Sequence, residues 1–289
     1  MPSEAETIER VGSVLGGVSP ADVKTDPYAH IVVDSPMSGE VYDRLAETFP
    51  PIEWFLGDLE KVGNNQAVRI PASQVLESDK FSPDWREFFR YHTSQDFWND
   101  IVRVFGDQLR AAHPALEDKV GKPFEEWRAQ LRGSGGLAEI NLDLLFVINT
   151  AVTSESSVRP AHVDATDKIF SGLFYMKPED DPTPGGDLAL YRPRKGEAQF
   201  GGHYAQPEEI DETDVVGYTA NRFIGFVNSP ASLHGVTPRP VTNRIRRYIN
   251  YVVETPFQAF EIPKLPLHKQ VLFALKHRRN KAKGITLGQ

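Results

Sequence analysis

The first half of the chain repeats its apolar positions mainly with the period of an α-helix. In "SPMSGEVYDRLAETFP" apolar residues recur at helical spacing, and Ser35 or Ser38 precedes them as a candidate N-cap. From about 84 to 116 aromatic and aliphatic residues keep a similar rhythm, which predicts two helices with a break near 93–94. The β-branched stretch "YAHIVVD" at 28–34 predicts one short strand.

The pattern changes after "RGSGG" at 132–136. Short apolar runs of strand length follow, separated by Gly and Pro: "LLFVINTAV", "IFSGLFYM", "DLALYR", "FIGFVN" and "RYINYVVE". Their spacing favours an antiparallel sandwich or barrel. We predict one α+β domain over 1–289, with a mainly helical N-terminal buttress at 1–136, a β core at 137–256 and a basic C-terminal helical tail at 257–289.

Composition narrows the possible functions. The net charge of −8 argues against broad binding to nucleic acid or an anionic membrane. The sequence has no cysteine, which excludes disulfides, thiolate zinc sites and cysteine nucleophiles. No secretory signal and no run near the roughly 20 apolar residues of a membrane span is visible, so we expect a cytoplasmic protein without a transmembrane segment. These patterns do not predict the oligomeric state.

Two charged segments lie outside the apolar pattern. "KLPLHKQVLFALKHRRNKAK" at 264–283 holds seven Lys or Arg and no acid, and predicts a solvated helix packed on the body or a site for an anionic partner. The insertion at about 180–219 is acidic in "QPEEIDETD". We expect this insertion and the helical first half to frame a substrate entrance.

Three residues offer metal-binding side chains. His162 and Asp164 are two apart in "RPAHVDATDKIFSGLFYMK", and residues i and i+2 of a strand project to the same side. His234 stands among apolar neighbours, where an unpaired imidazole would be costly to bury. Two imidazoles and one carboxylate can hold non-haem iron with positions left open. For His234 alone, a core histidine bonded to a backbone carbonyl is the alternative.

Arginines open the last apolar run, "RIRRYINYVVE". Strand parity places Arg246, Tyr248 and Asn250 on one face and Arg247 on the other. A buried arginine needs an anion, and a carboxylate matches its forked donors. Parity does not choose the inward arginine, and a pair of surface arginines is the alternative.

The order His162-x-Asp164, "PGGDLALYRP", His234 and then these arginines resembles the iron(II)- and 2-oxoglutarate-dependent dioxygenases, over about residues 138–255. The resemblance implies a double-stranded β-helix, or jelly roll, buttressed by the N-terminal helices. It implies Fe(II) held by His162, Asp164 and His234.

The resemblance also implies a place for the co-substrate. Arg246 is the first choice for the partner of the distal carboxylate of 2-oxoglutarate, Arg247 the second and Arg244, ten residues after His234, the third. Further side chains are candidates for the pocket or its rim, with ordinary strand or loop positions as the alternative: Asn149, Ser171, Tyr175 and His203.

The implied reaction uses O2 to convert 2-oxoglutarate to succinate and CO2 while hydroxylating an unactivated C–H bond. Family halogenases have a small residue in place of Asp164, so hydroxylation is favoured over halogenation, whereas desaturation and ring closure stay open. We expect a small metabolite or biosynthetic intermediate as substrate. The alternative is a cupin-like jelly-roll metal protein, acting as an isomerase or as a non-catalytic module that binds a small molecule or glycan.

Overall fold

The computed structural model describes residues 10–56, 63–194, 200–201, 203–205 and 207–263. The basic segment 264–283 therefore lies outside the described residues. In chain order the elements are η1 (Pro20–Asp22), β1 (His30–Asp34), α1 (Gly39–Glu47), η2 (Ile52–Trp54), β2 (Ala67–Pro71), α2 (Ala72–Glu77), α3 (Pro83–His92), α4 (Gln95–Ala112), α5 (Leu116–Val120), η4 (Phe124–Glu126), β3 (Ala129–Leu131), β4 (Ile140–Asn149), β5 (Lys168–Tyr175), β6 (Leu188–Pro193), β7 (Phe200–Gly201), β8 (Tyr204–Ala205), η5 (Pro207–Glu209), β9 (Ile210–Val216), β10 (Arg222–Val227), β11 (His234–Val236) and β12 (Arg246–Glu254).

Capping residues mark the ends of the predicted helices. Ser38 caps α1 by accepting a hydrogen bond from the backbone N–H of Val41, so of the two candidate caps the later one is used. The predicted break between two helices is confirmed, because Thr93 ends α3 and the Ser94 side chain caps α4.

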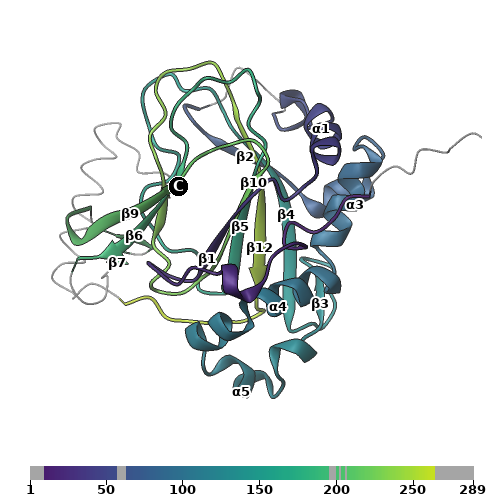
Figure 1. Cartoon of the computed structure of the whole chain (residues 1–289), viewed down its shortest axis with the longest axis vertical. Helices are drawn as coiled ribbons and strands as arrows, with labels where there is room; N and C mark the ends of the chain where they lie inside the picture. The colour runs from purple at the N-terminus through teal and green to yellow at the C-terminus, as the bar shows by residue number, and fades with distance from the viewer. Residues whose placement is uncertain (1–9, 57–62, 195–199, 202, 206, 264–289) are drawn as a thin grey trace, which may run out of the picture.

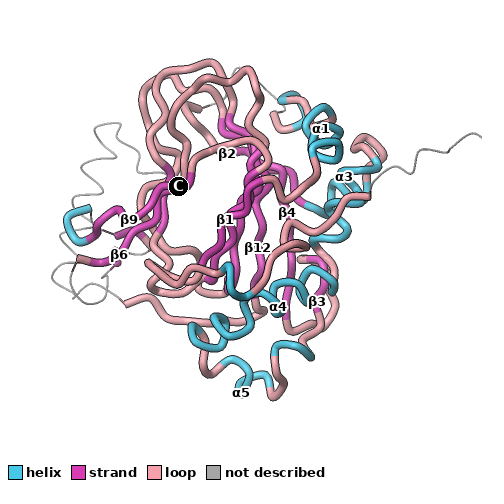
Figure 2. The backbone as a smooth tube through the Cα atoms, in the orientation of Figure 1, coloured by secondary structure: helices cyan, strands magenta, loops and turns pink. Residues whose placement is uncertain are grey.

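Two sheets face each other, as Figures 1 and 2 show. The large sheet has the order β1-β10-β5-β12-β4-β2, with β3 parallel to β4, and the small sheet has the order β11-β6-β9. After β4 the chain crosses to the small sheet near residue 162, returns in β5, and repeats this alternation through β6, β9, β10, β11 and β12. The fold is therefore an α+β jelly roll with a mainly β core, as expected.

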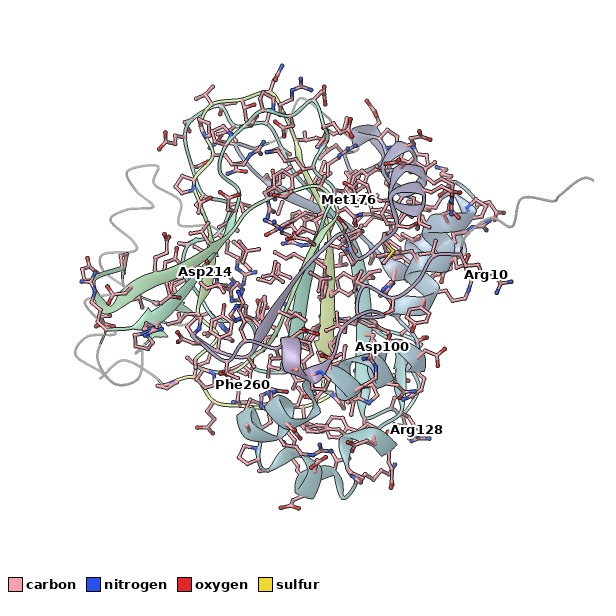
Figure 3. All side chains as sticks on the ribbon, viewed as in Figure 1. Arg10, Asp100, Arg128, Met176, Asp214 and Phe260 are labelled. Carbon is pink, nitrogen blue, oxygen red and sulfur yellow. The ribbon has the colours of Figure 1, made fainter. Side chains whose placement is uncertain are left out.

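Each face of the large sheet has its own core. Helices α3 and α4 cover the outer face, where Trp85 packs on Phe146 of β4 and Phe105 packs on Phe170 of β5. The inner face packs against the small sheet through Tyr175, Phe226 and Leu190. Figure 3 shows side chains filling these spaces, with Met176 inside and Asp214 of β9 at the periphery.

The structure differs from expectation around "RPAHVDATDKIF". The regular strand β5 begins only at Lys168; before it, His162 makes isolated bridges to His234 and Tyr204, and Asp164 lies in a loop. A turn closed by Lys168 N and Ala165 O reverses the chain into β5, which prevents a continuous strand here. The candidate metal-binding pair, His162 and Asp164, therefore stands at a crossing between the sheets rather than within a strand.

The first half contributes more strand than its pattern predicts. β2 and β3 both pair with β4 of the large sheet, and β1 forms its opposite edge, so the helical half and the β half share one sheet and one outer core. The acidic insertion likewise contains β9. No helix within the described part of the chain is both long and apolar enough to cross a membrane.

Candidate active site

His162, Asp164 and His234 meet at the edge of the small sheet. Their candidate ligand atoms all lie within 4.8 Å of one another, and all three side chains are buried. The backbones of the two histidines exchange hydrogen bonds of 2.8 and 3.0 Å, which fixes the imidazoles side by side. The three residues that the sequence singles out as metal ligands are thus brought together.

Backbone carbonyls orient both imidazoles. Nδ1 of His162 lies 2.9 Å from the carbonyl oxygen of Pro160, and Nδ1 of His234 lies 2.8 Å from that of Ser232. Each Nδ1 therefore carries the proton and each Nε2 keeps its lone pair. Burial lowers the pKa of His162, and burial together with the neighbouring His162 lowers the pKa of His234 to about 3. Both rings are in the neutral form that binds metal.

A chain of polar side chains holds the carboxylate of Asp164. Asn228 Nδ2 donates to Ser171 Oγ at 2.8 Å, and Ser171 Oγ donates to Asp164 Oδ2 at 2.8 Å. Burial alone would raise the pKa of Asp164, but the charge of Lys168 holds it well below its usual range. The other oxygen, Oδ1, lies 3.7 Å from Nε2 of His162.

These three residues fit a divalent metal. Nε2 of His162 is buried without a hydrogen-bond partner in the described structure, although a buried polar nitrogen is costly to leave unpaired. A metal ion bound by the two imidazoles and the oriented carboxylate would satisfy it, and this donor set suits non-haem iron(II).

Arg246 occupies a second polar centre between the sheets. Its side chain is 1% exposed, and the rings of Tyr175, Tyr218 and Tyr248 surround its guanidinium carbon at 5.1, 5.0 and 4.4 Å. The only hydrogen bond that it makes to the described residues runs from Nη1 to Asn149 Oδ1 at 3.2 Å.

The atoms left unpaired around Arg246 are all hydrogen-bond donors. Nε and Nη2 of Arg246, the hydroxyl of Tyr175 and Nδ2 of Asn149 are buried with no partner among the described residues. Burial raises the pKa of Tyr175 to about 12, so its hydroxyl keeps its proton at neutral pH. A buried cation beside unpaired donors needs an acceptor with negative charge, and a carboxylate fits. We call Arg246, Tyr175 and Asn149 together the donor cradle.

Close packing fixes the position of Arg246. Gly186 has φ of +77°, and a Cβ there would come within 3.0 Å of Cδ and 3.2 Å of Nε of Arg246. Glycine is therefore needed both for the backbone conformation and for the space. This pair of requirements explains a glycine of "PGGD" that the sequence alone did not connect to the arginine.

One cavity of about 530 Å³ joins the two centres. Its lining includes the three candidate metal ligands and Arg246. The strand neighbours Tyr248 and Asn250, which share a face with Arg246, also line it.

The other predicted site residues lie elsewhere. Arg247 points to the opposite face of β12, where its guanidinium carbon is 4.9 Å from the centre of the Phe49 ring and Nε donates to the carbonyl oxygen of Met176. Arg244 is at the surface and pairs with Asp180 at 2.7 Å. His203 contacts the backbone oxygen of Asp164 at 3.2 Å and lines a separate groove.

Sequence reasoning missed two residues near these centres. Asn228 completes the chain that orients Asp164, and Arg239, which is 2% exposed, packs with Arg246 on the same side of Gly186. Neither belongs to a short motif, so only the three-dimensional contacts identify them.

Comparison with solved structures supports the fold assignment. A structure of prolyl 4-hydroxylases from Phytophthora capsici matches with a TM-score of 0.52 at 15% identity, covering 96% of this chain and 78% of that one. A Pseudomonas putida prolyl-4-hydroxylase matches with a TM-score of 0.42 at 12% identity, covering 82% and 98%. The epimerase SnoN, in complex with Fe3+, alpha ketoglutarate and nogalamycin RO, matches with a TM-score of 0.41 at 15% identity, covering 78% of each chain.

No protein-family model and no curated protein sequence matches the chain. The prolyl 4-hydroxylase structure from Phytophthora capsici shares its fold with the chain, and a shared fold does not by itself fix a shared chemistry.

Proposed function

We propose that the protein is an iron(II)- and 2-oxoglutarate-dependent oxygenase that hydroxylates an unactivated C–H bond of a small metabolite or biosynthetic intermediate. One observation carries the proposal: a His-Asp-His cluster and Arg246, the cation of a donor cradle that lacks its acceptor among the described residues, line the same cavity. The shared fold is consistent with this function.

Each group has a defined task. His162, Asp164 and His234 would hold iron(II), which supplies oxygen activation coupled to oxidative decarboxylation of 2-oxoglutarate. Arg246 would bind the distal carboxylate of 2-oxoglutarate through Nε and Nη2, and the hydroxyl of Tyr175 would donate to the same group. The apolar walls formed by Leu173, Leu188 and Phe226 exclude water from the reacting end of the cavity.

Asp164 bears on the reaction outcome. As a metal ligand this carboxylate would take the place that family halogenases leave to halide, and the hydrogen bond from Ser171 orients it. This supports hydroxylation over halogenation.

The donor cradle separates this function from the alternative of a jelly-roll isomerase or binding module. A metal site alone would leave Arg246, Asn149 and Tyr175 as a buried cation with unpaired donors, which is destabilising. A dicarboxylate co-substrate gives these residues a role.

The test measures both binding and turnover. Protein supplied with iron(II) and ascorbate should form succinate from 2-oxoglutarate, faster with a suitable member of a panel of small metabolites. His162→Ala and Asp164→Ala should lose this succinate formation and bind iron(II) at least about tenfold more weakly, because a metal ligand is removed. Asp214→Ala, an exposed aspartate on β9, is the matched control and should behave as wild type. Unchanged iron binding and turnover in both ligand variants would show that the metal site is wrongly assigned.

A further inference from the structure

The cavity extends from the metal ligands to a rim with an excess of positive charge. Among the described residues that line the cavity, the cations are Arg69, Arg159, Lys168 and Arg246, and the only acid is Asp164. Four cations and one carboxylate give this lining a net charge of +3, although the whole chain carries −8. A cleft with a concentrated charge of one sign attracts ligands of the opposite sign.

The side-chain amides of Asn64 and Asn65 at the rim donate to neighbouring backbone and side-chain oxygens. Asn64 Nδ2 donates to Ser154 O at 3.1 Å and to Ser156 Oγ at 3.0 Å, and its Oδ1 accepts from Thr153 N at 2.6 Å. Asn65 Nδ2 donates to Ser156 O at 2.9 Å. These bonds join the turn at 63–66 to the loop at 153–156, so the backbone on this side of the rim is held in place.

Arg69 projects into the cavity from the edge strand β2. Its neighbours Val68 and Ile70 pack in the outer core with the helices, whereas Ala67 packs in the core between the sheets. Arg69 shares the parity of Ala67 and pairs in register with Val147 of β4, beside Tyr248. It is exposed and has no hydrogen-bond or ionic partner within the described ranges.

Arg159 reaches the cavity from the segment that leads to His162. Its backbone N–H donates to Ser157 Oγ at 3.1 Å, and its carbonyl accepts from Val236 N at 2.9 Å, so the backbone is held on both sides. The side chain is 42% exposed, and its one ionic contact with the described residues is to Asp164 Oδ1 at 3.8 Å. That carboxylate is the oxygen ligand of the candidate metal site.

Loading the site does not remove the charge excess. A divalent metal and dianionic 2-oxoglutarate cancel each other, and the metal competes with Arg159 and Lys168 for Asp164 Oδ1. We infer that the substrate carries an anionic carboxylate or phosphate group, which Arg69 and Arg159 bind at the rim while the remainder reaches toward the metal. This inference rests on the proposed function, and it narrows the substrate to acidic small molecules.

The test uses two simple anions as probes on the full chain. Protein loaded with iron(II) and 2-oxoglutarate under nitrogen is titrated calorimetrically with inorganic phosphate and, separately, with acetate, at low ionic strength because salt screens exposed charges. The co-substrate occupies Arg246, so a probe anion reports on the rim. At least one probe should bind saturably, and the tighter of the two identifies whether the rim prefers phosphate or carboxylate.

Variants locate the binding. Arg69→Gln and Arg159→Gln should each weaken the preferred anion about tenfold, the expected effect of losing one charged hydrogen bond. Arg90→Gln, an exposed arginine on α3, is the matched control and should bind as wild type. All three variants should keep wild-type affinity for 2-oxoglutarate.

Two results would overturn the inference: no saturable binding of either anion by wild type, or equal binding by wild type and both rim variants. If the wild-type protein did not bind 2-oxoglutarate but still bound a probe anion through Arg69 and Arg159, the result would contradict the proposed function and not this inference.

Discussion

At the scale of single residues, Arg246 is the buried charged side chain whose donors most clearly lack partners among the described residues. It is fully desolvated, and its charge is balanced in the described structure only by the amide oxygen of Asn149 and three aromatic faces. Desolvated cations of this kind are retained where an anion binds. Arg247, the next residue, faces the other side of the sheet, and its guanidinium group contacts the Phe49 ring and the carbonyl oxygen of Met176. It therefore needs no bound anion.

Replacing Arg246 and Arg247 one at a time should therefore affect 2-oxoglutarate binding unequally. Arg246→Gln should weaken 2-oxoglutarate binding by about 100-fold or more, because a buried charge pair is lost. Arg247→Gln should change it less than about threefold, since its partners lie on the other side of β12. Titration of 2-oxoglutarate into the iron-loaded protein under nitrogen measures both, with Arg244→Gln as a surface control. Similar small effects from Arg246→Gln and Arg247→Gln would mean that the carboxylate binds elsewhere.

Sequence reasoning at this scale could reach strand parity and no further. The alternation in "RIRRYINYVVE" separates Arg246 from Arg247, but the inward face is set by packing between the sheets, and the space for Arg246 depends on Gly186, sixty residues earlier. The support of Asp164 by Ser171 and Asn228 likewise needs β5 and the end of β10 to be adjacent. Such contacts between distant segments leave no local pattern.

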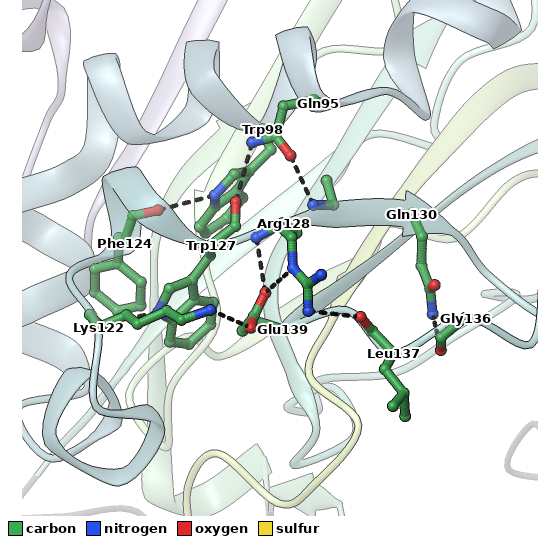
Figure 4. Close-up of polar contacts among 11 residues, drawn as sticks. Gln95, Trp98, Lys122, Phe124, Trp127, Arg128, Gln130, Gly136, Leu137 and Glu139 are labelled. Atoms are coloured by element: carbon green, nitrogen blue, oxygen red, sulfur yellow. Dashed lines mark hydrogen bonds and ion pairs between the residues drawn. The ribbon is translucent and has the colours of Figure 1, made fainter.

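At the scale of elements, the helices fix the base of β4, the strand that ends at Asn149. Figure 4 shows the contacts beneath α4, where the indole N–H of Trp98 donates to the carbonyl oxygen of Phe124 at 3.0 Å. The side-chain amide of Gln95 donates to the carbonyl oxygen of Trp127 and accepts from the backbone N–H of Ala129. Glu139, just before β4, accepts from Lys122 at 2.8 Å and from the backbone N–H of Arg128 at 2.9 Å.

Glu139 should make stability depend on acid pH. The hydrogen bond from Lys122 is the main cause that lowers its pKa from 4.5 to about 2 in the folded protein. The unfolded chain therefore binds the proton more tightly, and the stabilisation is present above about pH 4.5 and lost as pH falls toward about 2. Urea unfolding of wild type and Glu139→Gln should show a difference in unfolding free energy that shrinks across this interval.

Glu212→Gln, an exposed glutamate on β9, is the control for that measurement. It should match wild type at each pH. A difference between wild type and Glu139→Gln that stays constant from neutral to acid pH would show that the carboxylate charge does not stabilise the fold.

Element types with strong patterns were predictable, and weakly patterned ones were not. The apolar runs of β4, β5, β10 and β12 are long enough to identify as strands. β2 and β9 carry charged and exposed residues such as Arg69 and Asp214, because both lie at sheet edges. His162 and Asp164 leave the regular ladder because the chain changes sheets there, which periodicity does not reveal.

At the scale of the whole molecule, the candidate site joins the two sheets. The histidines belong to the small sheet and Arg246 to the large one, so ligands bound at both centres would bridge them. Ligands that bind only the folded state stabilise it by mass action.

Manganese(II), a redox-inactive probe here, and 2-oxoglutarate should therefore raise the unfolding temperature. Each ligand, at a concentration of about 100 times its dissociation constant, should add about 2.7 kcal/mol to the free energy of unfolding. Differential scanning calorimetry would measure this, and Asp164→Ala should lose the manganese-dependent part while Arg246→Gln loses the 2-oxoglutarate-dependent part. Undiminished stabilisation in these variants would place the ligands outside this cavity.

The rim and the reaction centre differ in how they are built. The donor cradle stands on strands of the large sheet, and the backbones of His162 and His234 bond each other where the chain crosses between the sheets. Arg69 stands on an edge strand and Arg159 on a loop held by local hydrogen bonds. Mutations at the rim can accumulate without disturbing the two cores, because loops and edges tolerate change better than packed interiors. Under the proposed function and the inferred anionic substrate, a lineage with this architecture can exchange one acidic metabolite for another while keeping the proposed oxidation chemistry, so its substrate range can evolve faster than its mechanism.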